Sequence, residues 1–173
     1  MKKHRRMLGA AAILTAAALF FPLRVLSVED EHGTVPFLVP VAVGERYTVR
    51  FIHSVMRRPV DEIYEIGPAS SILRETVYDM MGAGLPSAPE PGQTFTVEGN
   101  RFRISGFNLS IPLLTYRINK VVADHQMIFR GRTYPLKLWA APGRPLTFRV
   151  RKVSAWRAAW HAACRVLCRG NAA

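Results

Sequence analysis

In the segment 47–66, residues suited to a core alternate with residues suited to the other face of a sheet. This alternation constrains the fold more than any other feature of the sequence. A period of two is typical of β-strands, because successive side chains point to opposite faces of a sheet. The alternation breaks at residues 56–59, where Pro59 fixes its own φ angle and has no N–H to donate. The segment therefore predicts a β-hairpin with a four-residue turn and one face directed at a core.

Short apolar runs follow one another over residues 34–152, separated by glycines and prolines. Short strands at this spacing are typical of sandwiches and small barrels. We predict an all-β domain over 34–152, an antiparallel sandwich or partly open barrel, with an edge strand in the proline-interrupted run 35–43. The other expected strands are 72–78, 95–97, 101–104, 113–118, 127–129, 133–138 and 146–150.

The hairpin places a histidine and a glutamate on its core side. Pairing Val55 with Val60 gives well-matched neighbours on both faces and sets His53 directly across from Glu62. A carboxylate and an imidazole beneath a sheet form either a satisfied polar pair or a site that binds a ligand or moves a proton. The sequence leaves both interpretations open.

A glycine-rich turn follows at residues 79–86. Its two glycines permit positive φ angles, so successive amide hydrogens can point into one concavity and hold an anion. The simpler interpretation is an irregular turn, since no helix N-terminus or P-loop lysine follows. As a hypothesis, a small carboxylate would bind between this turn and the hairpin. The residues of that hypothesis are His53, Glu62, Tyr64, Gly82, Ala83 and Gly84.

The N-terminus has the pattern of an export signal. Residues 1–6 are basic, and an uncharged apolar run follows at 7–23. We expect residues 1–27 to be either a signal cleaved after Ser27 or a retained signal anchor in the inner membrane, with the rest of the chain in the periplasm.

The positive charge lies at the two ends of the chain. Residues 1–24 hold five basic residues and residues 149–173 hold six, with no acidic residue in either, so the formal net charge of +12 leaves only +1 between them. A nucleic-acid binder should carry a basic face on its folded domain, so we expect no nucleic-acid partner. The basic ends favour an anionic membrane surface or an acidic partner.

The segment 154–170 changes to helical spacing, with tryptophans on one face and basic residues on the other. Such a helix suits a bilayer interface or the flank of a membrane protein, but tryptophans also pack as ordinary core residues over a sheet. Both interpretations stay open. The expected membrane or partner contacts are Trp156, Arg157, Trp160, Arg165 and Leu167.

Catalytic and metal chemistry are weakly indicated. Ser54 follows His53 directly, and neighbouring strand residues point to opposite faces, so they do not form a nucleophile and its base. A metal site would need His53 and Glu62 together with His125 or Asp124, which lack the usual compact ligand spacing. We assign no catalytic residue, metal or cofactor, and a non-enzymatic role is favoured.

The hairpin and the glycine turn together carry a resemblance. The pattern F-I-H-S-V-x-x-x-P-V-D-E-I-Y-E-I, then G-A-G-L-P, then a Pro-Gly before the last strand, is similar to the bacterial family of unknown function numbered eighteen-fifty. The resemblance covers about residues 35–151. In place of the acidic residue that the family commonly has after H-S-V, this chain has Met56. The positions that the resemblance implies are His53, Ser54, Glu62, Tyr64, Gly82, Gly84 and Pro86.

This resemblance also implies a context for the protein. Members of the family are small exported proteins often encoded beside TRAP transporters of the TAXI type. We therefore expect an exported, membrane-associated accessory protein of solute uptake that binds a small carboxylate, a TRAP-type permease or a solute-binding protein. The alternatives are a purely structural interaction module and an enzyme that uses the pair His53 and Glu62.

Overall fold

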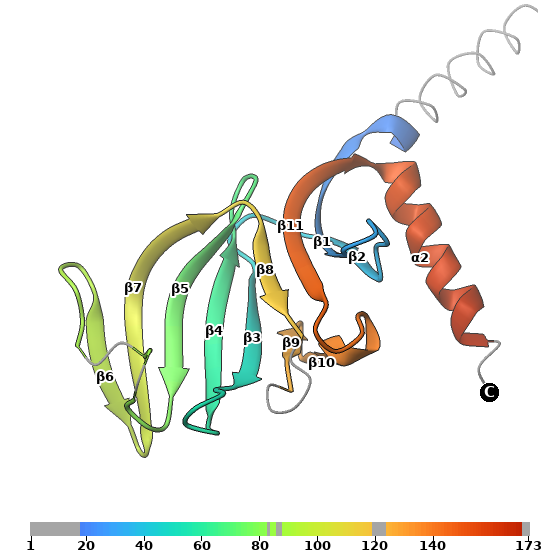
Figure 1. Cartoon of the computed structure of the whole chain (residues 1–173). Helices are drawn as coiled ribbons and strands as arrows, with labels where there is room; N and C mark the ends of the chain where they lie inside the picture. The colour runs from blue at the N-terminus through green and yellow to red at the C-terminus, as the bar shows by residue number, and fades with distance from the viewer. Residues whose placement is uncertain (1–17, 83, 86–87, 119–123, 171–173) are drawn as a thin grey trace, which may run out of the picture.

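The computed structural model describes residues 18–82, 84–85, 88–118 and 124–170, with side chains as far as 164. The described chain forms two antiparallel sheets and a C-terminal helix (Figure 1). The smaller sheet has the strand order β2-β1-β11-β8 and the larger has β10-β9-β3-β4-β5-β7-β6. The predicted antiparallel all-β architecture is confirmed, and the sheets do not close into a barrel. The elements are β1 (Pro22–Asp30), β2 (Phe37–Pro40), β3 (Arg46–Ile52), β4 (Pro59–Ile66), β5 (Ser71–Tyr78), β6 (Thr94–Glu98), β7 (Arg101–Ile111), β8 (Leu114–Arg117), β9 (Gln126–Phe129), β10 (Arg132–Pro135), the 3-10 helix η1 (Leu136–Leu138), β11 (Pro145–Ser154) and α2 (Ala155–Gly170).

The main hydrophobic core lies between the two sheets. Leu26 and Phe148 of the smaller sheet pack with Tyr47 and Val49 of the larger one, and all four side chains are buried. The ring of Tyr47 stacks between Tyr64 and Phe148, with centroid separations of 5.4 and 5.8 Å. Each such buried side chain contributes about 1.5–3 kcal/mol relative to an exposed one. The side chains on one face of β3 and β4 therefore pack in the core between the two layers, as the alternation predicted.

Strand β1 is an inner strand of the smaller sheet. It pairs with β11 over its whole length and with β2 on its other side, and its residues 25–28 are fully buried. The fold therefore begins at Pro22, within the segment 1–27 that the sequence suggested as a signal and ahead of residue 34. The sequence does not reveal this strand, because its apolar residues continue directly from the apolar run 7–23 and no change of composition marks its start.

Helix α2 forms a third layer on the outer face of the smaller sheet (Figure 1). Its buried residue Ala158 packs against Val25 and Leu38. Ring nitrogen Nε2 of His161 is hydrogen-bonded to the carbonyl oxygen of Val35, just before β2. The predicted helix is confirmed, and its contact with the β domain is made by the face that carries Ala158 and His161.

The outer face of the larger sheet is held by ion pairs. The carboxylate of Asp61 on β4 accepts two hydrogen bonds from Arg50 on β3, at 2.6 and 2.7 Å, and one from Arg101 on β7 at 3.0 Å. On the same sheet, Glu75 on β5 pairs with Arg46 at 2.7 Å and also with Arg103. This face is charged, so the core of the larger sheet lies on its other side.

Candidate functional site

The β3–β4 hairpin has a register that differs from the predicted one. Val49 lies across from Glu62 and Phe51 across from Val60, whereas the sequence suggested that His53 faces Glu62. The connecting loop runs from His53 to Arg58, closed by a hydrogen bond from the His53 N–H to the Arg58 carbonyl at 2.8 Å. The predicted register was therefore wrong. The shift is even, so it leaves every side chain on its expected face, and the alternation alone could not reveal it.

His53 and Glu62 consequently do not form a pair. Because His53 lies four residues beyond the partner of Glu62, the two Cα atoms are separated by roughly 13 Å of strand. Ring nitrogen Nδ1 of His53 instead accepts a hydrogen bond from the Met56 N–H at 3.3 Å. The alternative of an enzyme that uses this His–Glu pair loses its geometric basis.

His53 lies beside the glycine turn. A Cβ built on Gly84, whose φ is 83°, would be 3.8 Å from the Nε2 atom of His53. A Cβ on Gly82 would be 2.4 Å from the sulfur of Met56, so a larger residue there would require the Met56 side chain to move. The structure thus brings His53, Gly82 and Gly84 together, while Ala83 and Pro86 lie outside the described residues.

Glu62 forms a different polar centre, with two tyrosines. One of its carboxylate oxygens accepts hydrogen bonds from the hydroxyl of Tyr64, at 2.9 Å, and from the hydroxyl of Tyr116. The two phenol oxygens are 2.8 Å apart. Tyr64 belongs to the larger sheet and Tyr116 to the smaller one, so the carboxylate joins the two layers at the edge strand β8.

The tyrosines of this centre are held in their protonated form. Burial raises the pKa of Tyr64, and the negative charge of Glu62 raises it further. The pKa of Tyr116 is also raised well above its usual value, again by burial first and then by the charge of Glu62. Both phenols therefore stay neutral at physiological pH and act as hydrogen-bond donors toward the carboxylate.

Aromatic rings surround the centre. The rings of Phe51, Tyr116 and His125 pack against one another with centroid separations of 5.6 to 6.3 Å. The sequence did not place Tyr116 here, and it suggested His125 near Glu62 only as a candidate metal ligand. The alternation of 113–118 was a signal for an inward tyrosine, but nothing in the sequence indicates which strand of the other sheet it faces.

The chemistry of this centre favours a structural role for Glu62. Its carboxylate already accepts two phenol hydrogen bonds, and its charge disfavours a second carboxylate nearby. A small carboxylate ligand would fit better at His53 and Gly84, which offer a ring nitrogen and a backbone turn. Within the described ranges, no group of three or more His, Cys, Asp or Glu side chains is arranged to hold a metal ion.

A second candidate surface lies where α2 begins. Trp156 and Trp160 flank Ala158 by two residues on either side, and at about 100° per residue both leave the helix on the side opposite Ala158. They are 45% and 68% exposed. The helix packs over the smaller sheet, as one of the two interpretations of the sequence proposed, but both indole rings keep much of their surface exposed. Arg157 is also exposed, and the side chains of Arg165 and Leu167 lie outside the described ones.

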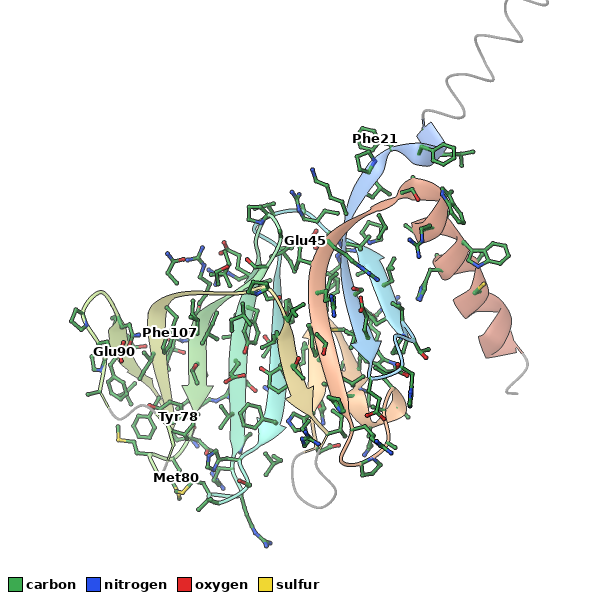
Figure 2. The ribbon with its side chains drawn as sticks, turned by 45° about the horizontal axis from the view of Figure 1, so that its top comes forward. Phe21, Glu45, Tyr78, Met80, Glu90 and Phe107 are labelled. Atoms are coloured by element: carbon green, nitrogen blue, oxygen red, sulfur yellow. The ribbon has the colours of Figure 1, made fainter. Side chains whose placement is uncertain are left out.

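Three further exposed apolar residues lie in the segment that meets the start of this helix. Leu19, Phe20 and Phe21 precede β1, and the Ala155 N–H at the start of α2 donates to the Phe21 carbonyl at 2.9 Å. Phe21 projects at one end of the molecule and Met80 lies at the other (Figure 2). We refer to Leu19, Phe20, Phe21, Trp156 and Trp160 as the aromatic surface. From residue 18 onward, no helix in the described chain is both long and apolar enough to cross a membrane.

Comparison with known proteins gives one match that covers much of the chain. Residues 47–136, slightly more than half of the 173 residues, match the family described as a domain of unknown function, DUF1850. The chain belongs to this family. The DUF1850 match spans β3 to β10, and so includes the hairpin, the glycine turn and Tyr116, whereas β1, β2, β11 and α2 lie outside it.

The segment before the DUF1850 match also resembles a known motif. Residues 2–23 match the opacity-associated protein A N-terminal motif, which therefore covers the basic residues and the apolar run. No curated protein and no solved structure matches the chain.

Proposed function

We propose that this DUF1850 protein is an exported accessory domain that is attached to the periplasmic side of the inner membrane. The observation that carries the proposal is the aromatic surface: its exposed apolar residues lie on the segment before β1 and on the first turns of α2, two elements joined by the hydrogen bond between Ala155 and Phe21. Tryptophan and phenylalanine next to basic residues suit the interface between lipid and water. The same end of the chain carries the basic residues 1–6, which favour an N-terminus on the cytoplasmic side.

The proposed role of this membrane-attached domain is in solute uptake. We infer that the domain serves a TRAP-type transporter of the TAXI class, as a partner of its permease or of its solute-binding protein. Support comes from the resemblance of the hairpin and glycine motifs. The hairpin loop contacts the glycine turn, and Met80 beside that turn lies at the end of the molecule away from Phe21 (Figure 2). In this arrangement the aromatic surface could contact the membrane while the hairpin loop and the glycine turn contact a partner protein.

A second candidate function is the binding of a small carboxylate at His53. Because Nδ1 of this ring accepts the Met56 N–H, a neutral imidazole carries its proton on Nε2, the atom that faces Gly84. An N–H donor beside a glycine turn suits a carboxylate oxygen. Titration calorimetry of the wild-type protein and of His53→Ala against small carboxylates tests this function, and the absence of heat with wild type would exclude it.

Photo-crosslinking tests the main proposal. The photoreactive residue benzoylphenylalanine is placed at Trp160 in the full chain, and the matched control places it at Leu138, which is 74% exposed and lies outside α2. We expect adducts with lipid or with a membrane protein from position 160 and none from position 138. An adduct with a TRAP-type permease would support the proposed role in solute uptake. The same soluble proteins captured from both positions would overturn membrane apposition.

A further inference from the structure

A groove lies between α2 and the smaller sheet. Its volume is about 300 Å³, and it opens along the flank of the helix that carries Arg157. Its lining residues come from the helix, from the end of β11 and from the segment around β2. They are Val35, Leu38, Arg151, Val153, Trp156, Arg157, Trp160 and His161.

The groove is apolar at its floor and basic at its wall. Val35, Leu38 and Val153 supply aliphatic surface, and the indole rings of Trp156 and Trp160 form the rim. Among the residues that the structure describes, no acidic side chain lines it. The two basic residues of the wall differ, because Arg151 pairs with Glu29 at 2.9 Å, whereas Arg157 has no ion-pair partner among the described residues. A ligand of opposite charge would therefore meet Arg157 first.

The groove shares two of its rim residues, Trp156 and Trp160, with the aromatic surface. The first residue of α2 is hydrogen-bonded to Phe21, so the groove begins next to the point where the N-terminal apolar run joins the fold. If the protein sits on a bilayer as proposed, lipid molecules are the most abundant amphiphiles at this position. A soluble anion would satisfy Arg157 but would leave the aliphatic floor unfilled.

We propose that this groove binds one anionic phospholipid, with the phosphate-bearing headgroup against Arg157 and the upper part of an acyl chain against Leu38 and Val153. The inference rests on the proposed membrane attachment and adds the ligand class. Charge complementarity supports it, since a basic residue near the surface favours anionic lipid. The volume matches the lower end of the range for small-molecule sites and would hold a headgroup with the first methylenes of a chain.

Fluorescence quenching tests the groove in the full chain. With Trp139→Phe, only Trp156 and Trp160 report, because the chain has three tryptophans. The protein is reconstituted in nanodiscs that contain a small fraction of brominated phosphatidylglycerol or, in a parallel sample, brominated phosphatidylcholine. We expect stronger quenching by the anionic lipid. Arg157→Ala should reduce this preference about fivefold, Arg157→Lys should retain it, and Arg132→Ala, at an exposed arginine of β10, should leave it unchanged.

The outcomes separate the two proposals. Equal quenching by both lipids in protein that co-migrates with the nanodiscs would overturn the groove while membrane attachment stands, as would an unchanged preference in Arg157→Ala. Protein that does not co-migrate with nanodiscs would overturn the proposed function itself. Arg157 is exposed, so a thermal melt of Arg157→Ala equal to that of wild type confirms that the variant is folded.

Discussion

At the scale of single residues, Glu62 is held by two phenol hydroxyls that come from different sheets. Its carboxylate lies on the core side of β4, where an unpaired charge would cost several kcal/mol. Tyr64 and Tyr116 remove that cost by donating hydrogen bonds in their neutral form. The residue that the hairpin pattern singled out is therefore a link between two layers, and His53, which was expected to contact it, contacts the glycine turn.

This link predicts the effect of removing one hydroxyl. Tyr116→Phe leaves the ring in place but deletes one of the two donors, so it should lower the free energy of unfolding by about 2 kcal/mol and Tm by about 4–8 °C. The control is Tyr134→Phe, at a tyrosine whose hydroxyl makes no hydrogen bond to the described residues. Equal thermal melts for the two variants would show that Tyr116 does not hold Glu62.

At the scale of elements, the two sheets and the helix differ in how far the sequence predicts them. The runs 72–78, 95–97 and 127–129 each became a strand, because their alternation or their turns mark both ends. Strand β1 could not be predicted, since the apolar run before it hides its start. The register of β3 and β4 could not be predicted either, because an even shift preserves every face.

The candidate site, too, could be predicted from the sequence only in part. The sequence identified the hairpin and the glycine turn as partners, and the structure places His53 beside Gly84. The polar centre required Tyr116, which is far from Glu62 along the chain and lies in the other sheet. Contacts between sheets depend on how the layers are stacked, and no local pattern records that arrangement.

An ion pair across strands predicts a pH dependence at this scale. Burial raises the pKa of Asp61, but the hydrogen bonds and charges of Arg50 and Arg101 outweigh it, so the pKa is lowered. A lowered pKa in the folded state stabilises the protein above the unfolded value of about 4, and this contribution is lost as the pH falls through the folded value.

We therefore expect Asp61→Asn to be less stable than wild type at pH 7 by about 2 kcal/mol and to lose less stability on acidification below about pH 4. Urea unfolding at a series of pH values measures both effects. The control is Glu90→Gln, at an exposed residue of the loop before β6. Parallel stability curves for wild type and Asp61→Asn would contradict the ion-pair account.

At the scale of the whole molecule, Phe21 of the aromatic surface and Met80, next to the glycine turn, lie at different ends (Figure 2). Strand β1 begins immediately after Phe21 and pairs with β11 from its first residue, so no linker separates the exposed residues 19–21 from the sheet. A cleavage after Ser27 would remove most of an inner strand, including the buried side chains of residues 25–27. The N-terminal apolar run and the β domain are thus joined closely, as the proposed membrane attachment requires.

The most direct test is the location and intact mass of the protein made from the full gene in cells. We predict that it is recovered from the membrane fraction and that its N-terminus lies upstream of Pro22, so that β1 is complete. A folded, soluble periplasmic protein that begins at Val28 would contradict both the role of β1 and the membrane-attached domain.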